Sequence, residues 1–282
     1  MNRRIIEEKL FVVLMLISLV TVLGSLLSVF AVVIINGAPA LSVSMITQTP
    51  KGGYYLGKEG GVLNAIVGSL YLASGATILS FLLSLPIALY IYEYVRGSRH
   101  IVSIRLSLDV LAGIPSIVFG AFTFTLMLFL GARTSLLWGM ITVSFFLIPI
   151  MTRAIDEVLR TVPPQLRETS FALGSTRLEL LSKVVIRQIL PGLLTAVLLS
   201  FGRAIGDAAA VLLTTGYTDN IPRSLTDPVA TLPLAIFFQL ATPIPEVQQR
   251  AYASAVILLV IVMTLSILSR LSMKRLTKYV VR

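Results

Sequence analysis

The 282-residue chain has no cysteine, a single histidine (His100) and only 13 acidic residues. Without cysteine it forms no disulfide and offers no thiolate to a metal ion. One histidine excludes the paired-histidine motifs of zinc enzymes, and no G-x-x-x-x-G-K-[S/T] loop is present to cradle the phosphates of ATP. His100 is interpreted as a solvated loop residue. The sequence therefore predicts a protein that is not an enzyme, with no catalytic residue, no metal ligand and no cofactor of its own.

Long apolar runs dominate what is present. Hydrophobic residues make up 56% of the chain and charged residues 13%, which excludes an ordinary soluble domain. A helix needs roughly 20 apolar residues to cross a bilayer, and six runs approach or exceed that length. They are Leu10–Ile35, Val62–Tyr92, Val110–Ala132, Thr134–Met151, about Gln188 to Thr215, and Ala251–Ser269. We therefore expect an all-α, polytopic membrane protein with six transmembrane helices.

The chain reads as one membrane domain without internal repeats. Its first apolar run is far longer than the roughly 7–15 residues of a signal-peptide core, so we expect it to remain as a span. Residues 1–60 hold the N-terminal tail, this span and an outer loop, and residues 61–282 hold the other five spans. Pro115 is expected to kink or interrupt the third span. The run Leu232–Leu240 is too short to cross and predicts a helix packed at the outer mouth.

The positions of the basic residues predict the orientation. Seventeen of the 23 Lys and Arg residues lie in the N-terminal tail, the loop after the second span, the stretch 152–190 and the C-terminal tail. Five lie in the other loops, and Arg203 lies within a span. Because positive loops stay on the cytoplasmic side, both termini and the stretch 152–190 are predicted to be cytoplasmic. The formal net charge of +10 is thus assigned to topology and contact with membrane lipid, and not to nucleic acid.

The charged stretch Thr152–Ile189 predicts two short helices that meet at a glycine. Pro163-Pro164 suits the start of the first helix, because proline tolerates the first turn. Gly174 suits its end, because glycine adopts the left-handed conformation of a C-terminal cap. The segment Thr176–Glu179 has the pattern of a capping box and would begin the second helix, which is expected to stop before Pro191.

We name residues 163–190 the elbow, and three interpretations of it were weighed. A DNA-binding helix-turn-helix has the same outline. Spans on both sides, however, hold the elbow against the membrane, where a recognition helix could not easily enter a major groove. An inert, solvated loop is the second interpretation. A docking surface for a cytoplasmic partner is the interpretation that we favour.

Arg203 and Asp207 interrupt an otherwise apolar run. A charge at bilayer depth costs about 2.5–3.5 kcal/mol on insertion scales, so such residues usually face a cavity and serve function. Four positions apart on a helix, they are expected to share a face and to pair. Gly202 and Gly206 form a G-x-x-x-G stripe that would let another helix approach closely. A permeation path and a structural ion pair beside a packing seam both remain open, whereas Asp156-Glu157 is interpreted as a solvated helix end.

The elbow resembles the EAA loop of ABC-transporter permeases, whose pattern is E-A-A, three residues, G, nine residues and I-x-L-P. Glu168-Thr169-Ser170, Gly174 and Val184–Arg187 align with it. Thr169 and Ser170 replace the two alanines, and Arg187 replaces the proline. In that family the loop lodges in a groove of the ATPase subunit. The resemblance implies an ATPase coupling loop, about residues 152–190, that includes Glu168, Thr169, Ser170, Ala172 and Gly174.

Three other stretches, Gly61–Leu70, Ala112–Gly120 and Arg203–Asp207, resemble phosphate permeases of the PstA family. The third resembles the R-A-x-G-E-T of that family, with Asp207 for glutamate and Ala208 for threonine. The sister family PstC shares R-A-x-G-E and stays an alternative. The resemblance implies the type I ABC importer (MetI-like) architecture and a permease subunit for inorganic phosphate in the cytoplasmic membrane.

The same resemblance implies the partners and the site. The partners are a second permease subunit (PstC-like), a cytoplasmic ATPase dimer (PstB-like) that carries ATP and Mg, and an external phosphate-binding protein (PstS-like). Arg203 and Asp207 would line the substrate pathway, with Asp207 holding Arg203 when the path is empty. Transport of another solute, such as molybdate or sulfate, is the alternative. A gradient-driven secondary transporter is a more distant one.

Overall fold

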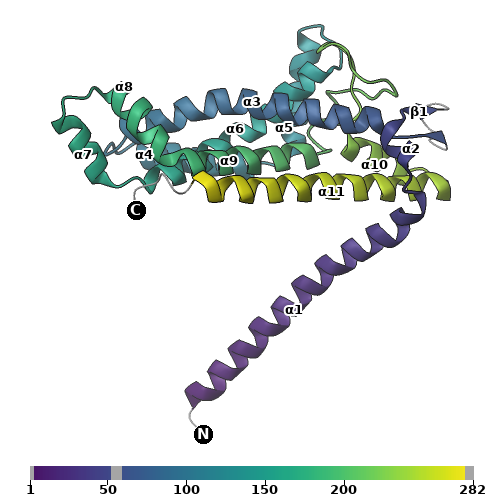
Figure 1. Cartoon of the computed structure of the whole chain (residues 1–282), viewed down its shortest axis with the longest axis horizontal. Helices are drawn as coiled ribbons and strands as arrows, with labels where there is room; N and C mark the ends of the chain where they lie inside the picture. Colours follow the sequence, from purple (N-terminus) through teal and green to yellow (C-terminus); the bar gives the residue numbers. More distant parts are fainter. Residues whose placement is uncertain (1–2, 52–58, 277–282) are drawn as a thin grey trace.

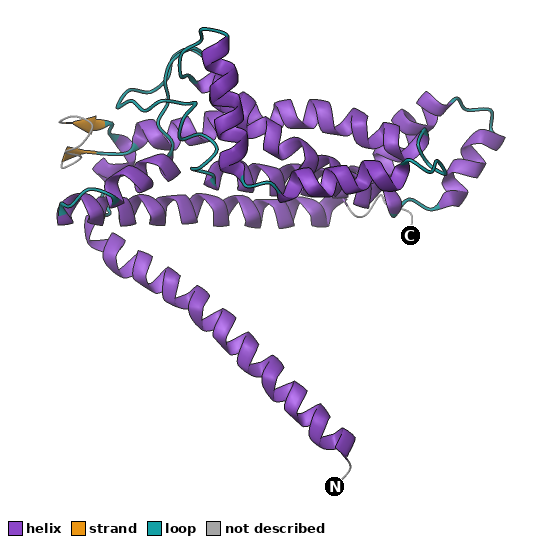
Figure 2. Ribbon diagram, turned by 180° about the vertical axis from the view of Figure 1, so that it is seen from behind, coloured by secondary structure: helices purple, strands orange, loops and turns teal. Residues whose placement is uncertain are grey.

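The computed structural model describes residues 3–51 and 59–276, which are mostly helical (Figure 2). The longer helices are α1 (Arg3–Gly37), α3 (Leu63–Glu93), α4 (Ile101–Gly113), α5 (Ser116–Phe129), α6 (Leu136–Arg160), α7 (Pro164–Ala172), α9 (Ile186–Gly206), α10 (Leu232–Leu240) and α11 (Pro245–Leu276). The short elements are a 3₁₀ turn (Ala38–Ala40), α2 (Val43–Thr47), α8 (Arg177–Glu179), a π-helical segment (Leu180–Val185) and the antiparallel strands β1 (Pro50–Lys51) and β2 (Glu59–Gly60). The predicted all-α class is therefore confirmed.

Four long helices, α3, α6, α9 and α11, run side by side as a bundle (Figure 1). Helices α7 and α8 lie at one end of this bundle, which we name the elbow end. Strand β1, α2 and α10 lie at the opposite end, which we name the far end. The last described turns of α11 return to the elbow end. Lys278, Arg282 and residues 52–58 of the predicted outer loop lie outside the described residues.

Within residues 3–51 and 59–276, five helices are long and apolar enough to cross a membrane, and there are six such spans if α4 and α5 count as one. These two helices are bent by 89° at the break between Gly113 and Ser116. The predicted interruption at Pro115 is thus confirmed. Ile114 adopts an extended backbone because a following proline disfavours the helical conformation. The predicted bounds Val110–Ala132 were wrong, since the helix before the break already begins at Ile101.

Helix α1 stands apart from the bundle and diverges from it along most of its length (Figure 1). None of the residues in its most apolar window is buried. It meets α11 at the far end, where a Cβ added to Gly37 would lie 2.7 Å from the carbonyl oxygen of Tyr252. The first predicted span is therefore present, but its side chains contribute little to the packing of the rest of the chain.

The interface between α3 and α6 forms the centre of the bundle. Its seam combines small residues with hydroxyl groups, which is a common way for membrane helices to pack closely. The Ser84 hydroxyl donates to the carbonyl oxygen of Ile148 at 3.1 Å, across the two helices. Apolar side chains that include Leu72, Val143 and Phe146 surround this seam and are almost fully buried.

Helix α6 continues beyond its predicted end at Met151 and stops at Arg160. Its last turns carry charged residues, which sequence reasoning assigned to a connecting stretch. The helix persists there because opposite charges spaced three and four positions apart stabilise it. Arg153 pairs with Asp156 and Glu157 in this way, and both carboxylates also pair with Arg160.

Two predictions about the fifth apolar run, Gln188 to Thr215, were wrong. Pro191 does not end the helix, because neighbouring residues such as Ile189 and Leu193 are packed in the bundle and hold it in place. The helix instead ends at Gly206, and residues 209–214 form turns. These turns are covered by protein: the Ala210 carbonyl oxygen would lie 2.6 Å from a Cβ added to Gly120 of α5.

Candidate functional site

The elbow has the helix–glycine–helix geometry that its sequence predicted. Pro164 opens α7, and Gly174 follows its C-terminus with a φ of +80°. The Gly174 N–H donates to the carbonyl oxygen of Phe171 at 2.9 Å. Thr176 and Glu179 form the predicted capping box of α8, with the Thr176 N–H 3.1 Å from Oε2 of Glu179. The chain then continues without interruption through the π-helical segment into α9, so the second arm of the elbow is part of a span.

The residues predicted for the coupling loop divide into an outer and an inner set. Glu168, Thr169, Ala172 and Gly174 are exposed on the elbow. Ser170 is buried and its hydroxyl bonds the hydroxyl of Ser175 at 2.6 Å, which ties α7 to the turn that follows it. Ser170 thus holds the shape of the elbow, while the other four residues face outward.

Sequence reasoning missed the contact that anchors the elbow. Glu93, the last residue of α3, has a fully buried side chain, and Arg167 of α7 grips it with two hydrogen bonds, at 3.2 Å from Nε and 2.9 Å from Nη2. Arg177 of α8 lies 3.9 Å from the same carboxylate. The hydrogen bond to Glu93 raises the pKa of Arg167 above its ordinary value. The elbow is therefore tied to a span by charges from both of its helices.

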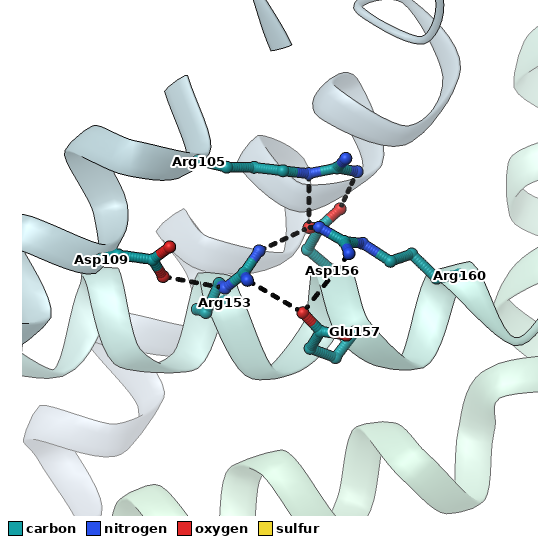
Figure 3. Close-up of polar contacts among 6 residues, drawn as sticks. All are labelled: Arg105, Asp109, Arg153, Asp156, Glu157 and Arg160. Carbon is teal, nitrogen blue, oxygen red and sulfur yellow. Dashed lines mark hydrogen bonds and ion pairs between the residues drawn. The ribbon is translucent and has the colours of Figure 1, made fainter. Parts of the chain in front are cut away.

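Asp156 lies at the centre of a second charged cluster at the elbow end (Figure 3). It is fully buried, so its interpretation as a solvated helix end was wrong. Arg105 of α4 donates to both of its oxygens, at 2.9 and 3.1 Å. Arg153 and Arg160 approach from its own helix, at 3.4 and 3.2 Å. The i, i+3 and i, i+4 spacings on α6 could have signalled part of this cluster.

The remaining members of that cluster balance its charge. Arg153 also pairs with Asp109 of α4 at 2.9 Å and with Glu157 at 3.1 Å. Three arginines and three carboxylates thus form one network that joins α4 to α6 (Figure 3). The buried carboxylate needs these partners, because a charge without them would be expensive to hold away from water.

Arg203 and Asp207 do not form the predicted pair. Helix α9 ends between them, so Asp207 leaves the helical face, and its Oδ1 accepts the N–H of Ala210 at 2.8 Å. Arg203 stays in the last turn of α9, where the helix terminus favours a cation. Its guanidinium carbon lies 5.8 Å from the ring centroid of Phe146. Among residues 3–51 and 59–276, Arg203 has no carboxylate within ion-pair distance, and its side chain is exposed.

Gly202 and Gly206 have open space beside them in the described part of the chain. No atom of another element lies within 4 Å of a Cβ added to either glycine. The predicted packing seam is therefore not formed inside the described residues. Gly206 is exposed, and Gly202 is half-buried beside a pocket that Val262 and Leu265 of α11 also line. Glycines that do admit close neighbours lie elsewhere in the bundle and include Gly68, Gly75, Gly120, Gly139 and Gly192.

A helical membrane protein with a broken span, an outward-facing arginine and an elbow at one end has the features of a transporter permease. The chain belongs to the family of binding-protein-dependent transport system inner membrane components, whose model matches residues 84–281. The resemblance to ABC-transporter permeases that the EAA-like loop predicted is thus confirmed.

Named relatives agree with this family. The phosphate transport system permease protein PstA of Haemophilus influenzae is 32% identical over 266 residues, which cover 94% of this chain and 93% of the relative. PstA 1 of Mycobacterium tuberculosis (strain H37Rv) is 35% identical over 210 residues, or 74% of this chain and 68% of that protein.

Solved structures agree at the level of the fold. A chain of a bacterial alginate ABC transporter, in complex with an alginate-bound periplasmic protein, has a TM-score of 0.69 and 13% identity, with 99% of each chain covered. A chain of the methionine transporter MetNI in an inward-facing conformation has a TM-score of 0.63 and 16% identity, with 76% of this chain and 95% of that chain covered. The predicted MetI-like architecture is confirmed.

Proposed function

We propose that this chain is a permease subunit of an ATP-driven importer that moves inorganic phosphate across the cytoplasmic membrane. Its termini and elbow would lie in the cytoplasm. The observation that carries the proposal is Arg203, a span cation whose guanidinium faces outward and has no carboxylate partner in the described part of the chain. The PstA relatives, one of which aligns with nearly the whole chain, support phosphate as the anion.

The elbow is proposed as the contact with the ATPase. Its outer surface combines the exposed coupling residues with two exposed leucines, Leu173 at 83% and Leu178 at 73%. Large apolar side chains at the tip of a solvated turn favour burial by a partner protein. The partner would be a cytoplasmic ATPase dimer (PstB-like) that binds ATP and Mg, none of which this chain would hold.

Arg203 is proposed to offset the cost of removing phosphate from water. A guanidinium presents several N–H donors in a planar fork that fits the oxygens of a phosphate. Because no carboxylate of the described residues occupies this fork, an arriving anion would not have to displace one. Asp207, four residues later, is proposed to line the same path. Because its Oδ1 accepts the N–H of Ala210 and the two residues do not pair, Asp207 is not proposed to hold Arg203 when the path is empty.

The stripe of Gly202 and Gly206 is proposed to receive a second permease subunit (PstC-like). Open glycines on a span let a neighbouring helix approach closely, and both glycines flank Arg203 on α9. The pathway would then close between the two permease subunits. An external phosphate-binding protein (PstS-like) would deliver the anion from the far end.

The test is reconstitution of the chain with these partners in proteoliposomes, followed by measurement of ATP hydrolysis and phosphate uptake. We expect both activities to require the binding protein loaded with phosphate. Stimulation by loaded sulfate- or molybdate-binding proteins instead would assign another anion. Uptake down a gradient without the ATPase would contradict the importer.

A pair of glycine variants tests the elbow within the same assay. Gly174 and Gly97 have φ values of +80° and +82° and open surroundings. Alanine at either position therefore costs about 1–2 kcal/mol of backbone strain. We expect Gly174→Ala to lower phosphate-stimulated ATP hydrolysis several-fold and Gly97→Ala, which lies in the loop after α3, to leave it near wild type. Equal losses in both variants would show that strain alone explains the effect.

A further inference from the structure

The ion pair between Glu93 and Arg167 is placed where a displacement of the elbow would reach a span. Glu93 ends α3, the helix that forms the centre of the bundle with α6. Arg167 lies in the middle of α7, on the arm of the elbow that is not itself part of a span. The pair joins residues 74 positions apart in sequence, so it is a tertiary link and not a helix-capping contact.

Among the described residues, the other contacts of α7 are apolar packing or lie within the elbow. Leu166 is the apolar side chain of α7 that packs against the cluster formed by residues such as Ala88 and Ile155. Ser170 is buried, but its hydroxyl bonds Ser175 within the elbow. Glu168, Thr169 and the other residues of the outer face are exposed. The directional contact between α7 and α3 is therefore the pair of hydrogen bonds that Arg167 donates to Glu93.

The position of Glu93 indicates a mechanical role more than a stabilising one. A carboxylate at the C-terminus of a helix faces the partial negative charge of the helix dipole, which is unfavourable. A buried ion pair is also weak evidence for stability, because desolvation offsets its attraction. Once buried, however, the carboxylate cannot lose its arginine without a large cost. When α7 moves, the end of α3 must therefore follow.

The second arm of the elbow reaches the same place more loosely. Arg177 of α8 lies 3.9 Å from the Glu93 carboxylate, at the limit of an ion pair, and its guanidinium carbon is 5.4 Å from the ring centroid of Tyr94. Its side chain is 59% exposed, against 31% for Arg167. The two arginines thus flank Gly174 in sequence and converge on the end of α3, with Arg167 making the stronger contact.

We propose that Glu93 is the positioning residue through which the elbow moves α3, with Arg167 as its principal partner and Arg177 as a secondary one. This inference rests on the proposed function, because the motion would come from the ATPase. It assigns a role to a residue outside the elbow and outside the substrate path. Loss of the ion pair between Glu93 and Arg167 would leave ATP hydrolysis intact while phosphate transport falls, because α7 would move without α3.

The experiment compares phosphate transported per ATP hydrolysed in proteoliposomes that contain the whole complex. We expect Arg167→Gln to lower this ratio at least fivefold while the complex still assembles, and Arg177→Gln to lower it less. Arg99→Gln is the control, because Arg99 is exposed in the loop between α3 and α4 and lies outside the elbow. An unchanged ratio in assembled Arg167→Gln complex would overturn the inference.

A covalent crosslink between positions 93 and 167 shows whether coupling needs a mechanical connection between α7 and α3 or needs the two charges themselves. The chain has no cysteine, so the double variant Glu93→Cys, Arg167→Cys introduces the only two thiols in this subunit. We expect the double variant to be uncoupled, and a short bifunctional thiol reagent that joins the two positions to restore the ratio. Confirmed crosslinking without restoration would also overturn the inference. If the wild-type complex itself shows no ATP-driven transport, the proposed function fails and not this inference alone.

Discussion

The charges at the elbow end are paired with opposite charges, whereas the charge of Arg203 at the end of α9 is not paired in the described residues. At the elbow end, the buried carboxylates of Asp156 and Glu93 each form an ion pair with an arginine from another helix. At the end of α9, Arg203 has an aromatic ring beside it and no carboxylate within reach in the described residues. Matched charges join helices here, whereas the unmatched charge of Arg203 is the one that we propose to meet an anion.

The largest effect that would test this comparison is expected at Asp156. Removing one partner of a buried ion pair costs about 3–5 kcal/mol, because the other charges stay behind. The three arginines are 25%, 28% and 40% exposed, so water screens them and we expect Asp156→Ala to cost about 3 kcal/mol. Thermal unfolding of the purified protein in detergent measures it.

Glu157 is the matched control for Asp156. It contacts two of the same arginines, but its side chain is 52% exposed. Glu157→Ala should therefore cost no more than about 1 kcal/mol. Equal shifts in melting temperature for the two variants would remove the distinction between buried and exposed members of the network.

The next effect is expected at Arg203, and it should appear in transport and not in stability. A hydrogen bond to a charged group is worth about 1.5–3 kcal/mol, which corresponds to roughly tenfold to hundredfold in affinity. We expect Arg203→Gln to lower phosphate uptake by that factor with little change in melting temperature, and Arg203→Lys to lower it less. A variant that melts early but transports normally would place Arg203 among the structural charges.

The smallest effect is expected at Asp207, as a change in preference between anions. Monohydrogen phosphate can donate a hydrogen bond to a carboxylate, and sulfate cannot. One such hydrogen bond is worth about 1 kcal/mol, so Asp207→Asn should reduce the preference for phosphate over sulfate by about fivefold. The asparagine oxygen can still accept the Ala210 N–H, which preserves the turn. Equal preference in both proteins at matched expression would contradict a role in selection.

The parts of the molecule that the sequence predicted are those that local rules determine. Gly174 and the capping box of Thr176 and Glu179 depend on neighbours within a few positions, and both formed as expected. The break at Pro115 follows from the restriction that proline imposes on the residue before it. Long apolar runs identified the spans, because their length and composition suffice for that purpose.

The parts that were missed depend on contacts between distant residues. Glu93 meets Arg167 across 74 positions and Asp156 meets Arg105 across 51, and no spacing in the sequence announces either contact. Helix α9 ends at Gly206, although the apolar segment Ala208–Leu213 that follows could have continued the span. Its end is set by packing of that segment against α5 and α6, and this separated Arg203 from Asp207.

The neutrality of the network around Asp156 has a consequence for the response of the protein to ionic strength. At about 1 M salt the Debye length falls to roughly 3 Å, and attraction between exposed charges such as Lys183 and Glu179 is largely screened. The Asp156 carboxylate itself is closed to solvent, so its contacts with the three arginines are screened less than an exposed pair. Added salt should therefore weaken the exposed pair of Lys183 and Glu179 more than it weakens the contacts of Asp156.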